Sequence, residues 1–466
     1  MKHRLSSVVA SLLAVAPLLA CNVGPNYERP QVESPASFRG QAPEPAATPA
    51  STSLADRRWW ELFEDETLEW LIRTALQQNY DVRIAAARLL EAEAQLGLAR
   101  ADQLPTLNAG VSAEGSRSVT SSRSAGSSEL RAELSASWEI DFWGKFRRAS
   151  EAARADLLAT EWGRRAACQS LVAQVASAYF NLGALDQQRA IAEGALEARR
   201  ESLRLTERRE QSGAGSLIDV YQAQELVQLA EGESIDLIRR IEQQENLLST
   251  LLGLDPRPIT RGRPFAAQAL PPLVPAGLPS ALLERRPDIQ AAEQQLVSAN
   301  AQVGVARADQ FPSLELTGSG GVASNALVAL FTSPVAFLGA AGRLVQPLFD
   351  GGRRSAQVEA ADARARQAEL TYRSTILQAM REVSDALVGF HRNRELASSR
   401  GTLVEASRQA LTLVEARYEG GSSSYLEVLD ANSRRLDAEL AQVRARLDVL
   451  LSYVDVYRAL GGGWEV

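Results

Sequence analysis

Cysteine and histidine are scarce in this chain of 466 residues, which holds two of each. Cys21 follows an apolar N-terminal run, and Cys168 stands in an Ala-rich apolar stretch, where we expect a small core residue. An intrachain disulfide framework is excluded, because only one cysteine remains beyond the N-terminal segment. His3 belongs to that segment, so His391 is the one histidine left. A Ser-His-Asp triad, a Cys-His pair and a metal cluster would each need more.

A surplus of basic residues is missing as well. Lys and Arg number 50 against 57 Asp and Glu, which gives a formal net charge of -7. Such a chain carries no basic field for nucleic acid. No glycine-rich phosphate loop follows a strand pattern. We therefore expect a protein that is not an enzyme, binds no nucleic acid and holds no metal or other cofactor.

The N-terminus predicts a secretory signal peptide over residues 1–20. A short cationic stretch precedes an apolar run from Val8 to Leu19, which is too short to span a bilayer. The run ends in LLAC, which resembles a bacterial lipobox with Cys21 as the acylated residue; an ordinary cleavage site that happens to contain a cysteine is the alternative. Stable anchoring takes more than one acyl chain. Asn22 in place of an aspartate favours the outer membrane, by resemblance to lipoprotein sorting signals.

The rest of the chain predicts an extended tether followed by a tandem repeat. Residues 21–57, beginning at the lipidated cysteine, are rich in Pro, Ala and Ser and lack periodicity. Two copies of one unit then follow, over 58–263 and 264–466. The stretch ARADQLPTL from Ala99 recurs as ARADQFPSL from Ala306, and further pairs keep a constant offset that slips by one residue only once. This pattern indicates one duplicated structural unit.

Each copy predicts two strands that cross a membrane. Residues 129–142 alternate between apolar and polar side chains over a length that crosses a bilayer at a tilt, and residues 106–114 begin their partner strand. In the second copy, 313–320 and 335–349 take these places, with a weaker alternation. The expected loop SRSVTSSRSAGSS is polar, whereas its counterpart ASNALVALFTSP is less so, and we find no physical account of that difference. We expect Arg131, Glu133 and Ser135 to face water and Leu130, Leu134 and Trp138 to face lipid.

Long helices are predicted on either side of the strands. One helix is expected over Leu68–Ala101, before Pro105, which cannot continue it. Helix resumes at Arg147 and at Arg353. From Arg147 to Gln211 about 65 residues run without a proline, which corresponds to a helical path of about 100 Å. Such a length suits no compact globular core. A two-stranded coiled coil is the alternative, but it has no place for the strands.

Four strands per chain leave two open sheet edges. Lipid offers no hydrogen-bond partners to the backbone N–H and C=O groups at these edges. The chain must therefore oligomerise to close a barrel. Two chains would supply eight strands, whose interior the side chains fill, and three would supply 12, which leaves room for a water-filled passage. The helices would continue that barrel as a tube.

Several motifs in order along the chain carry a family resemblance. They include GPNYERP from Gly24, DFWGK from Asp141, LLERRPDI from Leu282, PLFDGGRR from Pro347 and RYEGGSSSYLEVLDA from Arg417. The chain resembles the TolC-type outer membrane factors, and among them most the lipoprotein branch (OprM-like, NodT family) of RND tripartite efflux systems. The resemblance implies a mixed α and β membrane protein: a homotrimer with a 12-stranded β-barrel in the outer membrane lipid and a long periplasmic α-helical barrel. Its implied partners are a periplasmic adaptor (membrane fusion) protein and an inner membrane RND transporter.

Two turns between helices predict a gate. They are SGAGS, Ser212 to Ser216, and GGSSS, Gly420 to Ser424, and the carboxylates of Asp219, Glu427 and Asp430 follow them. In a trimer these acids would form a ring at the periplasmic tip that favours cations. By resemblance, the family's constriction and its holding bonds match Asp219, Tyr418, Glu427 and Asp430. One departure concerns the latch, since some family members place an Arg where this second turn has only serines.

A structural role competes with the gate for some of these residues. SLID from Ser216 and SYLE from Ser424 both fit the capping box, in which the acid satisfies a backbone N–H at the start of a helix. Asp430 lies one turn further on and fits no such box. Arg209 and Arg417 could support the gate by neutralising carboxylates, or be solvated charges near helix C-termini.

The sequence thus favours a passive exit duct for drugs or other small molecules, with energy supplied by partner proteins. Two alternatives stay open. One is the outer membrane duct of a type I protein secretion system, and the other is a lipid-anchored periplasmic coiled-coil scaffold whose strands never enter lipid. The strict alternation before Trp138 argues against the scaffold, which needs no two-faced strand.

Overall fold

The structure is a computed structural model that describes residues 22–32, 35, 37–39, 65–120, 123–271 and 282–463. The predicted signal peptide, Cys21 and most of the predicted tether lie outside these residues. The chain divides into two compact units. Unit 1 comprises Met1–Gln31, Arg88–Glu161 and Ala291–Arg373, and unit 2 comprises Val32–Ala87, Trp162–Gln290 and Ser374–Val466.

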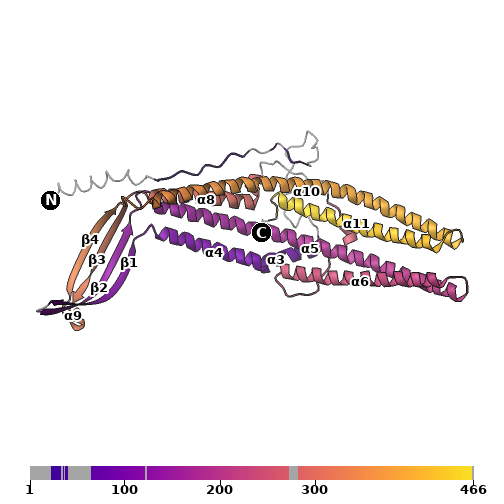
Figure 1. Ribbon diagram of the computed structural model, residues 1–466, viewed down its shortest axis with the longest axis horizontal. Helices are drawn as coiled ribbons and strands as arrows, with labels where there is room; N and C mark the ends of the chain where they lie inside the picture. Colours follow the sequence, from indigo (N-terminus) through magenta and orange to yellow (C-terminus); the bar gives the residue numbers. More distant parts are fainter. Residues whose placement is uncertain are drawn as a thin grey trace. The chain divides into compact units, whose positions relative to one another are not determined.

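Helices make up most of the described chain (Figure 1). They are α3 (Glu66–Gln78), α4 (Tyr80–Ala101), α5 (Lys145–Gln211), α6 (Leu217–Leu251), the 3-10 turn η3 (Phe265–Ala267), α7 (Leu282–Arg285), α8 (Pro287–Ala308), α9 (Leu327–Thr332), α10 (Arg353–Glu419) and α11 (Tyr425–Ala459). The duplication is visible in their lengths, because α5 and α10 both have 67 residues and α6 and α11 both have 35. Within the described residues, no helix is both long and apolar enough to cross a membrane.

The helix expected over Leu68–Ala101 is in fact two helices, α3 and α4, which break at Asn79. Asn79 leaves the helical region with ψ of 132°, and its side-chain oxygen accepts a hydrogen bond from the backbone N of Asp81 at 2.8 Å. Its amide nitrogen donates to the carbonyl of Leu251 at 2.9 Å. An asparagine that bonds to nearby backbone competes with the helix and caps the next one, which explains the break.

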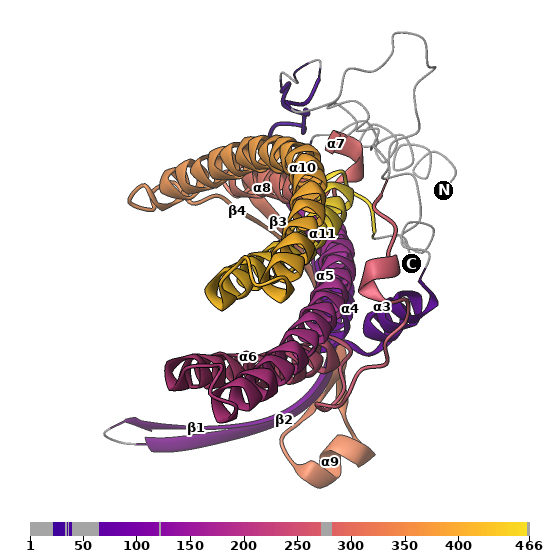
Figure 2. The ribbon, with the colours of Figure 1, turned by 90° about the vertical axis from the view of Figure 1, so that its right-hand side faces the viewer.

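In unit 2, α6 runs back along α5, and α11 runs back along α10 (Figure 2). The same ion pair joins the helices of each hairpin: Arg200 contacts Glu231 at 2.7 Å, and Arg408 contacts Glu439 at 2.8 Å. In both pairs the partners are 31 residues apart in the chain. The two hairpins are therefore the two copies of one unit, in the same register.

Unit 1 holds an antiparallel sheet in the order β1-β2-β3-β4 (Figure 1). The strands are β1 (Thr106–Thr120), β2 (Arg123–Glu139), β3 (Ser313–Ser324) and β4 (Val335–Val345). Among the described residues, β1 and β4 are the edges of the sheet. All four expected strands are present, but their ends differ from those predicted.

The predicted loop of the first hairpin is mostly strand. β1 continues past residue 114 and β2 begins before residue 129, with paired backbones as far as Thr120 and Arg123. Backbone pairing needs no apolar pattern, so polarity was a poor guide to the strand ends. β2 stops at Glu139, not at 142, because the N of Phe142 donates to the carbonyl of Ile140 at 2.8 Å in a tight turn.

The second hairpin differs from its prediction at both ends of the connection. β3 runs on to Ser324, and the segment predicted as a loop contains the short helix α9. β4 stops at Val345 instead of at 349, shortly before Pro347. A proline has no backbone N–H and cannot donate a hydrogen bond to a neighbouring strand. Asp350 lies just before α10, and its carboxylate accepts a hydrogen bond from the backbone N of Gly352 at 3.0 Å.

The strand register gives the sheet two different faces. Successive residues alternate between faces, and the cross-strand pairs Ala109–Leu134, Leu134–Gly320 and Gly320–Leu338 lie on one of them. That face carries Leu107, Ala109, Val111, Ala113, Leu130, Ala132, Leu134, Ala136, Trp138, Leu314, Leu316, Val322, Leu338, Ala340 and Leu344. The opposite face carries Glu129, Arg131, Glu133, Ser135 and Ser137, together with the cross-strand pair of Glu315 and Arg343.

Candidate functional site

The first predicted gate turn joins α5 to α6. Gly213 has φ of 76°, a left-handed conformation that ends α5 at low steric cost. Ser216 caps α6, with its hydroxyl accepting from the backbone N of Ile218 at 3.2 Å. The carboxylate of Asp219 accepts from the backbone N of Ser216 at 3.3 Å, which completes a capping box. The structural alternative considered for Asp219 is therefore present, and its half-buried side chain is committed to its own helix.

The second turn joins α10 to α11 in the same way. Gly421 has φ of 74°, and Ser424 caps α11. The carboxylate of Glu427 accepts from the backbone N of Ser424 at 3.2 Å, so the second capping box is present as well. Arg417 donates from its guanidinium to the carbonyl of Ser422 at 3.3 Å, which ties it to its own turn. Glu427 and Arg417 are exposed.

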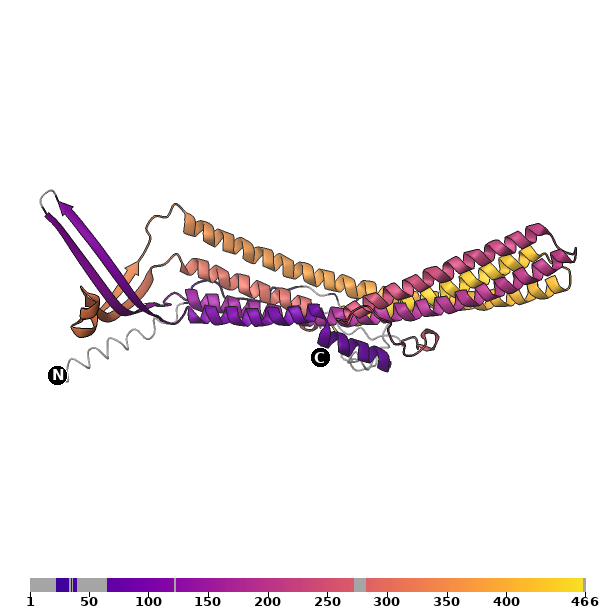
Figure 3. The ribbon, with the colours of Figure 1, turned by 90° about the horizontal axis from the view of Figure 1, so that it is seen from below.

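A set of polar contacts, here called the turn bridge, joins the first hairpin to the second within unit 2. It consists of Arg209, Tyr418, Ser202 and Tyr425. The guanidinium of Arg209 donates to the hydroxyl of Tyr418, and its Cζ lies 5.4 Å from the ring centroid. The hydroxyls of Ser202 and Tyr425 share a hydrogen bond, and the two tyrosine rings lie 5.8 Å apart. The turns of both hairpins lie at the same end of unit 2 (Figure 3).

Sequence reasoning named Arg209 and Tyr418 but missed Ser202 and Tyr425. Tyr425 was available as a signal, because it stands in the same motif as Glu427 and begins α11 beside the turn. Ser202 offered none, since it is one of many polar residues on the long helix α5.

Asp430 pairs with Arg434 of the same helix at 2.9 Å, and its side chain is 58% exposed. Both residues line a groove of about 780 Å³ between α10 and α11, together with Glu427. Leu403, Ala410 and Ala441 supply an apolar floor there. The structure thus places Glu427 and Asp430 in one groove. It also brings Arg209 into contact with Tyr418. Asp219 and Arg417, in contrast, form hydrogen bonds within their own turns.

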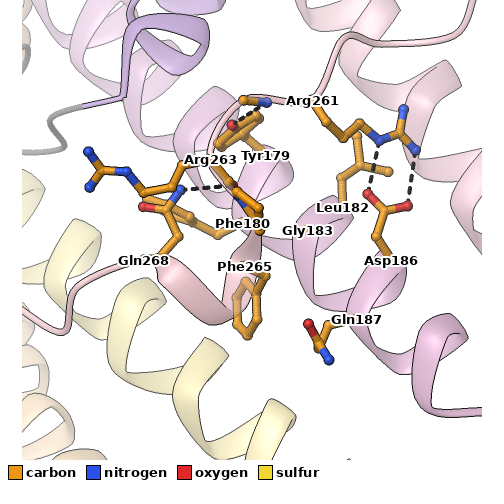
Figure 4. A pocket seen from close by; sticks show the side chains of 12 residues that line it. Tyr179, Phe180, Leu182, Gly183, Asp186, Gln187, Arg261, Arg263, Phe265 and Gln268 are labelled. Atoms are coloured by element: carbon orange, nitrogen blue, oxygen red, sulfur yellow. Dashed lines mark hydrogen bonds and ion pairs between the residues drawn. The ribbon is translucent and has the colours of Figure 1, made fainter.

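A second pocket, also in unit 2, lies where the segment after α6 packs on α5 (Figure 4). Its wall is organised by the buried carboxylate of Asp65, which accepts from the hydroxyl of Tyr179 and from the side-chain amide of Gln268, each at 2.9 Å. Burial, and then this contact with Asp65, raises the pKa of the Tyr179 hydroxyl. Arg261 pairs with Asp186 at 2.9 Å at the other side of the pocket. These contacts fix the mid-chain segment 259–268 onto α5.

The exposed apolar residues of the sheet concentrate on one face. Leu107, Val111 and Leu338 are 73, 79 and 92% exposed on the apolar face defined above. On the polar face, Arg131 contacts Glu129 at 2.9 Å and lies over the ring of Phe337, with its Cζ 4.9 Å from the centroid. A sheet with one apolar and one charged face is suited to lie between lipid and water.

Two observations concern metal-ligating and nucleophilic side chains in the part of the chain that the structure describes. No group of three or more His, Cys, Asp or Glu side chains there could hold a metal ion. Cys168 is buried, and burial raises the pKa of its thiol, which makes it a poor nucleophile.

Comparisons with known proteins agree with this geometry. The sequence profile of the outer membrane efflux protein family matches residues 71–254 and 278–462. The outer membrane protein OprJ of Pseudomonas aeruginosa is 34% identical over 464 residues, which cover 98% of this chain and 96% of OprJ. The solvent efflux pump outer membrane protein SrpC of Pseudomonas putida is 35% identical over 462 residues, or 98% of each chain.

The fold is also that of solved channels. The open-state crystal structure of the Neisseria gonorrhoeae MtrE outer membrane channel matches with a TM-score of 0.85 and 34% identity, over 96% of this chain and 99% of MtrE. The double match of the family profile follows the internal repeat. The family is one of transport proteins and not of enzymes. The chain belongs to the outer membrane efflux protein family, and it is an efflux channel of the outer membrane.

Proposed function

We propose that three copies of the chain close a 12-stranded barrel and conduct small molecules passively from the periplasm to the exterior. The two-faced sheet with open edges at β1 and β4 carries this proposal. An edge strand in lipid leaves backbone N–H and C=O groups without partners, each at a cost of several kcal/mol. Pairing of β4 with β1 of the next copy removes that cost.

In such a barrel the charged face of the sheet points inward, so that its side chains line a water-filled passage. Glu129, Arg131 and Glu133 of β2 would line it with Glu315 and Arg343 of the neighbouring strands. Twelve strands leave a lumen that eight would fill with side chains. The apolar face, with Leu107, Val111 and Leu338, would contact acyl chains.

We place the gate at the two helical turns. The turn bridge holds α5 against α10 and α11, and it would keep the tip narrow. Glu427 and Asp430, repeated in three copies, would add a ring of negative charge that attracts cations and retards anions. Opening requires that the contact between Arg209 and Tyr418 breaks, which partner binding can drive only if it favours the open arrangement.

The partners we propose are a periplasmic adaptor protein and an inner membrane RND transporter, which supplies the energy. The groove between α10 and α11, with an apolar floor and charged Glu427, Asp430 and Arg434, offers a surface for a helix of the adaptor. Acyl chains on Cys21 would add a membrane anchor to the barrel. The name of the relative SrpC, a solvent efflux pump component, favours small-molecule cargo over protein cargo.

The purified full-length protein in planar bilayers tests the channel directly. We expect detergent-resistant trimers and stepwise ionic conductance. A control preparation with Leu107, Val111 and Leu338 changed to Glu should lose insertion, since charges on the lipid face are costly. Monomers without conductance would reject the proposal and favour a periplasmic scaffold.

A further inference from the structure

A third pocket, of about 410 Å³, lies in unit 2 between α5, α6 and α11. Its lining combines two arginines, Arg240 of α6 and Arg444 of α11, with the amide side chains of Asn181, Gln188, Gln243 and Gln244. Ala184, Leu185 and Leu447 complete it with apolar surface. No carboxylate lines this pocket within the described residues, although the chain as a whole is acidic.

Three of the amide side chains in this pocket, those of Asn181, Gln243 and Gln244, form hydrogen bonds within the protein, whereas Arg240, Arg444 and Gln188 do not within the described residues. Neither Arg240 nor Arg444 forms an ion pair or a hydrogen bond with any residue that the structure describes. The side chain of Gln188 is only 5% exposed, yet its amide has no hydrogen-bond partner among those residues either. The Gln188 amide is therefore free to bond to a group in the pocket, and the exposed guanidinium groups of Arg240 and Arg444 have no carboxylate there to balance their charge. A ligand with hydrogen-bonding groups and a negative charge would match this lining.

The pocket opens on the side of α5 that faces away from the segment 259–268. With about 100° of rotation per residue, Gln188 points opposite to Tyr179 and Asp186, which contact that segment. On α11, Arg446 donates to the carbonyl of Gln268 at 3.0 Å, and Arg444 points away from it by about 200°. In the tube proposed above, a segment packed across the helices lies outside, so the pocket opens toward the lumen.

We propose that this pocket is a weak binding site for small carboxylates in transit through the channel. A guanidinium fork binds a planar carboxylate with two hydrogen bonds, the Gln188 amide supplies a third group, and Leu185 and Leu447 accommodate an apolar body. The proposal rests on the proposed channel, because only a lumen delivers cargo to this side of the helices. It assigns an anion site to a duct whose tip is acidic.

The test uses 4-(trifluoromethyl)benzoate as the probe and fluorine NMR of the detergent-solubilised, full-length protein as the readout. We expect saturable binding that unlabelled benzoate displaces, and much weaker binding of the neutral isostere 4-(trifluoromethyl)benzamide. The double variant Arg240→Gln, Arg444→Gln should lower benzoate affinity at least about tenfold. The matched variant Arg392→Gln, Arg458→Gln removes the same charge from α10 and α11, outside the pocket, and should bind like the unchanged protein.

Two results would overturn the site: equal benzoate binding by both double variants, or equal binding of benzoate and benzamide by the unchanged protein. Bilayer conductance of the same preparations separates this outcome from a failure of the channel itself. A protein that conducts, with benzoate binding indifferent to Arg240 and Arg444, refutes the pocket alone. A protein that does not conduct refutes the channel, whatever the probe does.

Discussion

The guanidinium of Arg209 donates a hydrogen bond to the hydroxyl of Tyr418, although the two residues are 209 positions apart in the chain. They lie in the last turns of α5 and α10, so this contact joins the same ends of the two equivalent helices. A bond between repeats at their turns is suited to a latch, because it breaks without disturbing either capping box.

Loss of this contact should open the gate. Tyr418→Phe keeps the ring over Arg209 but removes the acceptor, and Arg209→Ala removes the guanidinium as well. We expect higher single-channel conductance in planar bilayers for both, with the larger effect for Arg209→Ala. Arg208→Ala is the control, since Arg208 is close to Glu201, at 3.6 Å, and takes no part in the turn bridge. Conductance equal to that of the control would remove the turn bridge from the gate.

Carboxylates at the tip should control cation block. Asp430→Ala should raise the conductance and weaken block by divalent cations, because one negative charge per copy leaves the ring. Glu427→Ala should do the same and also remove the hydrogen bond that the Glu427 carboxylate accepts from the backbone N of Ser424 in the capping box. The comparison with Asp219→Ala is informative, since Asp219 has the same capping role. A block that weakens in Glu427→Ala and Asp219→Ala but not in Asp430→Ala would tie the effect to capping and not to a ring.

Acylation should depend on one residue. Cys21→Ser is expected to abolish incorporation of radiolabelled palmitate, because no thiol remains at the predicted lipobox. Trimers should still form and conduct, since the barrel inserts through its own apolar face. Cys168→Ser serves as the control and should keep the label. Absence of label from the unchanged protein would mean that the leader is cut at an ordinary site, and persistent labelling of Cys21→Ser would mean that another residue is acylated.

The Asp65 network should be needed for stability. Asp65→Ala leaves the Tyr179 hydroxyl and the Gln268 amide without their acceptor, and each buried donor of this kind costs about 1–3 kcal/mol. We expect a clear drop in the thermal unfolding midpoint of the solubilised protein. Asp186→Ala breaks the more exposed pair with Arg261 and should cost less. A larger drop for Asp186→Ala would contradict the importance assigned to Asp65.

The architecture was accessible from sequence because its signals are strong and repeated. Pro105 stops one helix, strict alternation marks the strand before Trp138, and the repeat transfers both readings to the second copy. The capping boxes of Asp219 and Glu427 were also readable from spacing, and both are present.

The remaining features depend on contacts that a one-dimensional pattern does not contain. Asn79 breaks a helix through bonds to its own neighbours and to Leu251, which is 172 positions away. The helix α9 sits in a segment whose apolar residues gave no clear periodicity. Arg209 and Tyr418 were both named, Tyr418 for the constriction and its holding bonds and Arg209 as a support of the gate or a solvated charge, but the contact between them was not predicted. The pocket around Gln188 requires three helices to be brought together before it exists.

The equal lengths of α5 and α10, and of α6 and α11, restrict how this chain can evolve. Deleting one residue from a helix rotates everything beyond it by about 100° and shortens it by about 1.5 Å. A deletion in α5 alone would carry Arg209 away from Tyr418 and set one turn short of the other. Substitutions can accumulate freely on the exposed faces, whereas insertions and deletions are tolerated only in whole multiples of the helical repeat or in both copies together.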